Sequence, residues 1–253
     1  MLNYMKSELY RTLRNRSLWI ATSVAAILMF AVIFILNHFA SDPTFPYSDT
    51  RFALGNIYMQ MMLVLLFAVI FVLYMNDNEE KQHTIKHSVA FGFKRSTIYM
   101  GRFVTQILVS SLVYIVLVTL YTLLAYGLLQ HSNEGELELL LRVSFGSMTC
   151  LFAVIAVTDY FLINYENQSA ATVSSVFILV GLPIIFNSLG RKIGVFEVLS
   201  EVLPYNLMAS YGPLFSTEMD KTTALLQCLG IGTVWMVVFL VLGVMKFNRK
   251  EII

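Results

Sequence analysis

Charged residues are scarce in this chain of 253 amino acids. Asp, Glu, Lys and Arg together make up 13% of it, about half of the ~25% usual in soluble domains. Hydrophobic residues, counted with tyrosine, make up 57% of the chain. The usual fraction in soluble proteins, roughly 45–50%, counts glycine in place of tyrosine. Because the chain has 13 tyrosines and 13 glycines, its fraction is 57% on either count. This composition excludes an ordinary soluble domain, and the high apolar content also excludes a disordered chain.

Three other features that the sequence lacks exclude further classes of function. The net charge is only +1, so the surplus of Lys and Arg that marks a nucleic-acid surface is missing. Cys150 and Cys228 both lie inside apolar runs, which predicts small packing residues without disulfide or metal spacing. No glycine is followed by lysine, so the chain lacks the loop that cradles ATP phosphates. We therefore expect it to bind no nucleotide, magnesium or other cofactor itself.

Catalytic and metal-ligating residue types do not converge in the sequence, so we expect no enzyme active site. Glu79, His83 and His87 follow one another at intervals of four residues, which would place all three on one face of a helix. The HExxH pattern is absent, however, and no cysteine or third histidine is near. A solvated or partner-facing stripe is the favoured interpretation, with no metal.

What the chain does contain is long apolar runs. Six of them match the length of about 20 residues that a helix needs to cross a ~30 Å hydrocarbon core, and they are too long for the strands of a membrane barrel. They lie at Leu18–Asn37, Ile57–Met75, Phe103–Leu129, Val143–Tyr165, Ser169–Asn187 and Thr223–Met245. The sequence predicts an all-α, polytopic membrane protein, with residues 1–253 forming a single transmembrane domain.

Basic residues collect on one side of these spans. Twelve of the 17 Lys and Arg residues fall before the first span, between the second and third, or after the sixth. Short cytoplasmic segments carry such an excess. Both termini are therefore expected in the cytoplasm.

Three segments between or beside the spans have patterns of their own. Residues 1–16 predict an amphipathic helix with a basic face at the inner membrane surface, or a solvated tail that only sets topology. Residues 76–102 form the longest polar cytoplasmic segment, with an apolar stripe that either docks on a partner or tucks against the bundle. Residues 188–222 predict outer amphipathic helices, one over Val195–Leu203 that ends at Pro204.

Two polar features lie inside the spans. Asp159, in the fourth, is the only acidic or basic residue well inside a span, and such a residue is either functional or held by Thr158, Tyr160 and Asn164 as a structural group. Thr172 and Ser175, with Leu179, follow helical spacing in the fifth span. This face favours close helix approach, either within one bundle or between two copies.

The combination resembles the permease subunits of type-2 ABC transporters. The resemblance covers nearly the whole chain, and it includes a basic elbow helix, six spans, a coupling segment between spans two and three, and re-entrant helices before span six. Its most specific stretch is similar to the E…GTIK…G…R..IY run of the family, although His83 stands where the family usually has Gly. LPYNLM, residues 203–208, also resembles the family's segment before span six. The resemblance assigns residues of this stretch to ATPase coupling, and we add its apolar Phe91. The full set is Glu80, Thr84, Ile85, Lys86, Phe91, Gly92, Arg95, Ile98 and Tyr99.

The resemblance implies partners and a location. It implies a homodimer, or a heterodimer with a sister permease, bound to two ABC ATPase subunits that hold ATP and Mg. It also implies a bacterial plasma membrane protein that exports amphipathic peptides, like the exporters of phenol-soluble modulins or lantibiotic-immunity permeases.

Two other functions remain open from the sequence. One is an ion- or proton-coupled carrier that uses Asp159, although the related halves and broken helices common in such carriers are not evident. The other is an immunity or sensing subunit that binds an antimicrobial peptide with little transport.

Overall fold

The computed structural model describes most of the chain as a bundle of helices. The described residues are 2–40, 47–59, 61–82, 92–131, 135–165, 167–211, 214 and 221–249. In chain order, the first four helices among these residues are α1 (Leu2–Leu13), α2 (Arg16–Phe39), α3 (Thr50–Met59) and α4 (Met61–Gln82). The helices that follow are α6 (Arg95–Leu128), α7 (Glu136–Asn164), α8 (Gln168–Val176), the π-helix η1 (Phe177–Gly181), α9 (Leu182–Gly190), α10 (Gly194–Glu201), α11 (Pro204–Ala209) and α12 (Lys221–Arg249).

Five of these helical stretches are long and apolar enough to cross a membrane, which confirms the all-helical, multi-pass prediction. They are α2, α6, α7, the continuous stretch of α8, η1 and α9, and α12 from Thr222. The described residues of the second predicted span, Ile57–Met75, belong to α3 and α4, and the apolar helix found among them is the shorter Val64–Asn76. Five candidate spans are thus present among the described residues, and the sixth stays a prediction.

Several helix ends differ from the sequence-based boundaries; α7, for example, begins at Glu136 and not at Val143. The third span was expected from Phe103, but α6 begins at Arg95, after Gly92 with its φ of 83°. Positive φ favours glycine because it has no Cβ to clash with the backbone. The outer helix predicted over Val195–Leu203 is α10, which ends at Glu201 and not at Pro204. Pro204 is instead the first residue of α11, where its missing N–H costs no helical hydrogen bond.

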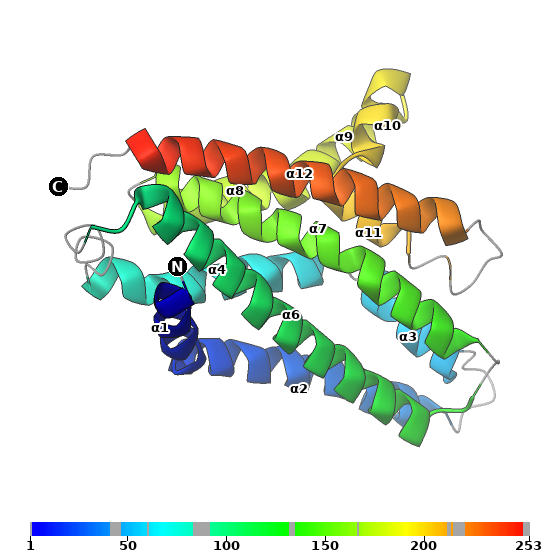
Figure 1. Ribbon diagram of the computed structural model, residues 1–253. Coiled ribbons are helices and arrows are strands. Elements are labelled where there is room, and N and C mark those ends of the chain that lie inside the picture. The colour runs from blue at the N-terminus through cyan, green and yellow to red at the C-terminus, as the bar shows by residue number, and fades with distance from the viewer. Residues whose placement is uncertain are drawn as a thin grey trace.

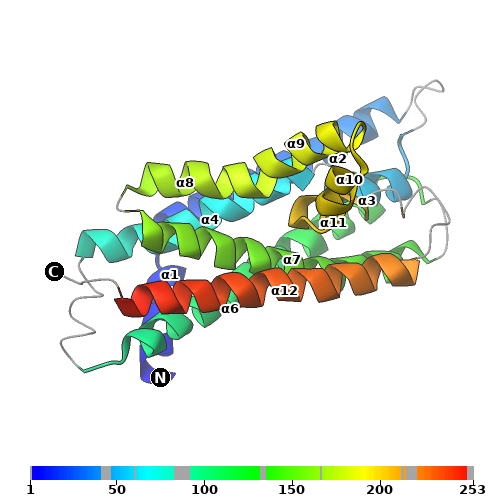
Figure 2. The ribbon, with the colours of Figure 1, turned by 90° about the horizontal axis from the view of Figure 1, so that it is seen from above.

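The bundle has two distinct ends. Figures 1 and 2 show both termini at one end, where α1 and α6 begin and where α4 and α12 finish. We call this the terminal end, and the opposite end, where α6 finishes and α7 begins, the distal end. The helices α9 and α10 project from the bundle near the distal end (Figure 1).

The core lies around α7. Among the 18 most apolar consecutive residues of α7, 56% are buried, whereas the same fraction in α2 is 11%. α7 packs along α12 (Figure 1), where Gly232 lets the backbone approach Thr149 and Cys150. The outward residues of α2, such as Ile20, Ile27 and Phe34, are instead more than half exposed. Apolar side chains that face outward suit contact with lipid.

Candidate functional site

A cluster of four polar side chains is buried near the terminal end of the bundle. Asn76 of α4, Arg102 and Gln106 of α6, and Asp159 of α7 are 6%, 9%, 2% and 0% exposed. We call these four residues the polar cluster. Buried polar groups are costly unless they find partners, so their contacts decide what the cluster can do.

The contacts converge on one carboxylate oxygen. Asp159 Oδ1 accepts hydrogen bonds from Asn76 Nδ2 at 3.2 Å and from Gln106 Nε2 at 3.1 Å. Arg102 Nη2 lies 3.5 Å from the same oxygen and completes a buried ion pair. Gln106 Nε2 also donates to Asn76 Oδ1 at 3.0 Å, so the two amides are linked to each other. Three helices are joined at this point.

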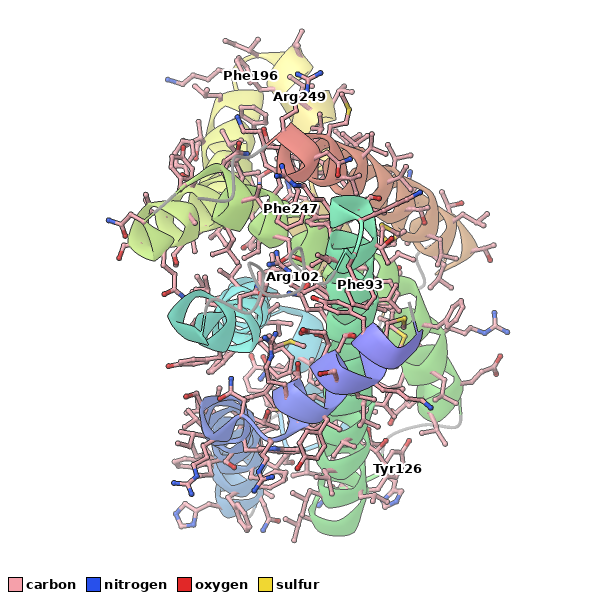
Figure 3. The ribbon with its side chains drawn as sticks, turned by 60° about the vertical axis from the view of Figure 1, so that its left-hand side comes forward. Phe93, Arg102, Tyr126, Phe196, Phe247 and Arg249 are labelled. Carbon is pink, nitrogen blue, oxygen red and sulfur yellow. The ribbon has the colours of Figure 1, made fainter. Side chains whose placement is uncertain are left out.

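Helical spacing brings these groups together. Arg102 and Gln106 are four residues apart and share one face of α6. At the ~1.5 Å rise per residue of an α-helix, Asp159 lies roughly 8 Å from the end of α7 and Arg102 about 10 Å from the start of α6. The cluster is therefore in the outermost turns of the bundle, where Arg102 also sits 5.8 Å from the Tyr99 ring centroid. Figure 3 shows Arg102 between α4 and α6.

The partners of Asp159 described above come from α4 and α6, whereas two of the three neighbours expected to hold it, Thr158 and Asn164, have other hydrogen bonds. Thr158 Oγ1 donates to Val154 O at 2.8 Å, and Asn164 Nδ2 donates to Tyr160 O at 3.1 Å. Both side chains thus bond their own helix backbone. Sequence reasoning missed Asn76 and Gln106, although an amide inside an apolar span is itself a signal for an interhelical hydrogen bond.

α1 docks beside the polar cluster. The Tyr4 ring packs on Gly101, where a Cβ atom would come within 2.7 Å of it, and the Tyr4 and Phe93 ring centroids are 6.0 Å apart. Asn15, the N-cap of α2, donates to Tyr74 O at 2.6 Å. α1 is therefore attached to α6, and the start of α2 is attached to α4.

α12 closes the same end of the bundle. Arg95 Nη1 donates to Asn248 O at 3.1 Å, and the Tyr99 and Phe247 ring centroids are 5.8 Å apart. Ile98 and Tyr99 are only 2% and 1% exposed. The described part of the proposed coupling stretch thus contacts the bundle itself.

The remaining residues of that stretch are less fully described. Glu80 lies in the last turn of α4. Thr84, Ile85, Lys86 and Phe91 lie outside the described residues, as do His83 and His87. Their assignment to coupling stays a prediction.

The small-residue face of the fifth span packs inside the bundle. Ser175 and Leu179 are fully buried and Thr172 is partly buried. Ser175 Oγ donates to Ala171 O at 2.8 Å, so its hydroxyl is satisfied within α8. Close packing of this face within one chain is observed, and self-association through it is a separate prediction.

Two other buried contacts link helices towards the distal end. Cys150 Sγ and Cys228 Sγ, from α7 and α12, are 3.4 Å apart as free thiols. Thr50 Oγ1 donates to Glu136 Oε2 at 2.7 Å and ties α3 to the first turn of α7. Among the described residues, no three His, Cys, Asp or Glu side chains gather as metal ligands.

An apolar cavity of about 250 Å³ lies between α2, α3, α4, α6 and α7. α2 is anchored near its two ends, by buried Leu18 and by Ile33 and Leu36. Its middle turns, including Ala25 and Met29, stand over the cavity. Asp159 is not among the lining residues, so the polar cluster and this cavity are separate features.

Comparison with known proteins gives one match. The profile of a family described as ABC-2 family transporter protein matches residues 4–189, which is more than half of the chain. The match runs from α1 to α9 and includes all four residues of the polar cluster. No curated protein matches the sequence.

Proposed function

Because the chain belongs to the ABC-2 transporter family, we propose that it is the membrane-spanning permease of an ATP-driven exporter. A separate ABC ATPase, in two copies, supplies the energy by binding and hydrolysing ATP with Mg. The observation that carries the proposal is the family match over residues 4–189, which spans the helices on both sides of the segment between α4 and α6. The chain has no glycine-lysine pair to hold phosphates.

The proposed arrangement of the helices in the membrane follows the topology predicted from the sequence. α1 acts as the elbow helix at the inner surface, and α3 with α4 supplies the sixth crossing. The terminal end faces the cytoplasm of a bacterial cell, since its segments carry most of the basic residues. The segment between α4 and α6, from Glu80 to Arg95, then faces the ATPase, while Ile98 and Tyr99 anchor its end inside the bundle. A second copy, or a sister permease, completes the membrane unit.

The proposed cargo is an amphipathic peptide or a similarly hydrophobic substrate. The cavity beside α2 supports this class, because aliphatic and aromatic side chains such as Val113 and Phe67 dominate its lining. Polar groups suited to a sugar or an inorganic ion are few there. The polar cluster also favours ATP-driven work over proton coupling through Asp159, since that carboxylate is enclosed by Arg102 and two amides.

The test is to purify the tagged chain from its native membranes in mild detergent and identify what accompanies it. The proposal predicts a P-loop ATPase that hydrolyses ATP faster in the complex than alone. Substituting Ile85, Phe91 or Arg95 should reduce this stimulation while membrane insertion is unchanged. Matched substitution of Leu141, which is exposed on α7 near the distal end, should leave it unaltered. A chain that purifies without any ATPase contradicts the proposal.

A further inference from the structure

We propose that the polar cluster is a positioning joint that carries movement of α4 and α6 into α7. The inference rests on the proposed function, since it assumes that an ATPase acts on the segment between these two helices. None of the four residues is expected to touch the ATPase or the substrate. Their task is to keep three helices in one register while force is applied at the terminal end.

The position of the cluster supports this role. Asn76 lies on α4 shortly before the segment, and Arg102 and Gln106 lie on α6 shortly after it. Both helices therefore reach Asp159 from opposite sides of the same segment. Because hydrogen bonds require short distances and aligned donors, a sliding movement of either helix breaks contacts with α7. Apolar side chains alone would let the helices slide by small steps.

α7 is suited to carry the movement onward. It is a single helix of 29 residues, about 43 Å long at ~1.5 Å per residue. It contacts α12 through the Cys150–Cys228 pair and Gly232. At the distal end Glu136 accepts a hydrogen bond from Thr50 of α3. Displacement of Asp159 is thereby transmitted to both α12 and α3.

Stability alone does not explain the cluster. Burying an ion pair removes two charges from water, and a well-packed apolar pair of similar volume is often as stable or more stable. The chain nevertheless keeps a carboxylate, a guanidinium and two amides where the surrounding core is apolar, including Val72, Phe103 and Ile155. Directional contacts provide what apolar packing lacks, namely a fixed register.

The test replaces both charges at once. The double variant Arg102→Met, Asp159→Leu removes the ion pair without leaving either charge buried and alone. The control double variant Glu138→Leu, Arg142→Met removes an exposed pair on the same helix, with an N–O distance of 2.5 Å. Each is purified with its companion ATPase and reconstituted in sealed vesicles. Melting temperature, ATPase retention, and efflux of a dansyl-labelled amphipathic helical peptide per ATP are measured.

In the cluster double variant Asn76 still donates to Val72 O and Gln106 still donates to Asn76 Oδ1, so neither amide nitrogen is left unpaired. The joint therefore predicts that this variant keeps its melting temperature and its ATPase, while efflux per ATP falls about tenfold, within the 5–150-fold range typical of coupled sites. The control variant should couple like the native chain. Native coupling in a stable cluster variant would overturn the inference and leave the proposed function standing. If the native complex itself transports without ATP, the proposed function fails and the joint fails with it.

A second variant keeps the test decisive if the double variant does not assemble. Gln106→Met retains the volume and the Arg102–Asp159 pair, but it removes the amide that donates to both Asp159 and Asn76. A fall in efflux per ATP with unchanged melting temperature supports the joint. Unchanged efflux per ATP overturns it, because the register would then not depend on these hydrogen bonds.

Discussion

Glu136 and Glu138 lie two residues apart in the first turn of α7 and have opposite surroundings. Glu136 is 6% exposed and accepts a hydrogen bond from the buried hydroxyl of Thr50. Glu138 is 67% exposed and pairs with Arg142 on the surface. Substitutions at these two positions therefore compare the contribution of a buried polar contact to stability with that of a solvated one.

Glu136→Ala should lower the free energy of unfolding by about 1–3 kcal/mol, because the Thr50 hydroxyl loses its buried acceptor. Glu138→Ala should change it by less than about 0.5 kcal/mol, as is usual for exposed pairs. Denaturant unfolding in detergent, followed by circular dichroism, measures both. Equal effects at the two positions would contradict the buried contact between α3 and α7.

At this scale the sequence identified Asp159 but not its partners. A lone acid in an apolar run is visible in any reading of the sequence. Asn76 and Arg102 were instead grouped with the polar cytoplasmic segment, because they lie at its two ends. Only the packing of α4, α6 and α7 brings them to one carboxylate, and no local pattern encodes that meeting.

Glycine spacing on α12 determines how closely this helix approaches α7. A Cβ atom at Gly232 would meet Thr149 Oγ1 at 2.8 Å and Cys150 Sγ at 3.1 Å. At Gly230, one half-turn away, a Cβ atom would meet nothing within 4 Å. These two glycines thus have different roles: Gly232 is required by contact with α7, and Gly230 is not.

Gly232→Val should destabilise the protein by about 1–3 kcal/mol, since overpacking forces the two helices apart. Gly230→Val should be tolerated, because its side chain would point away from the bundle. Melting temperatures of the two purified variants compare them directly. The same loss of stability in both would show that helix propensity, and not the contact with α7, is responsible.

The long helices were predictable because a continuous apolar run has few alternatives in a membrane. The second span was less so. Ile57–Met75 reads as one run, and its described residues belong to α3 and α4, where Tyr121 Oη of α6 donates to Ala53 O. This contact between α3 and α6 leaves no mark on the composition of the run. The π-helical turn at Phe177–Gly181 also has no sequence signature.

At the scale of the whole molecule, the arrangement of the helices brings the two termini to the same end of the bundle (Figure 2). Exposed positions suited to labelling exist at both ends. Lys94 lies before α6 at the terminal end, and His131 follows α6 at the distal end. Both native cysteines are buried, so they should give little background with a bulky maleimide.

The proposed orientation predicts that His131→Cys reacts with a membrane-impermeant maleimide on intact cells. Lys94→Cys should react only after the membrane is permeabilised, because the terminal end faces the cytoplasm. Gel mobility after labelling reports each reaction. Labelling of Lys94→Cys on intact cells would reverse the orientation and remove the ATPase from reach of the coupling stretch.

The most direct measurement is peptide movement across a sealed vesicle that contains the purified permease with its companion ATPase. A labelled amphipathic peptide should cross only when ATP and Mg are present on the side of the terminal end. Transport should stop when the ATPase is removed or cannot hydrolyse ATP. If the chain alone moves the peptide without nucleotide, the claim that a separate ATPase drives it is wrong.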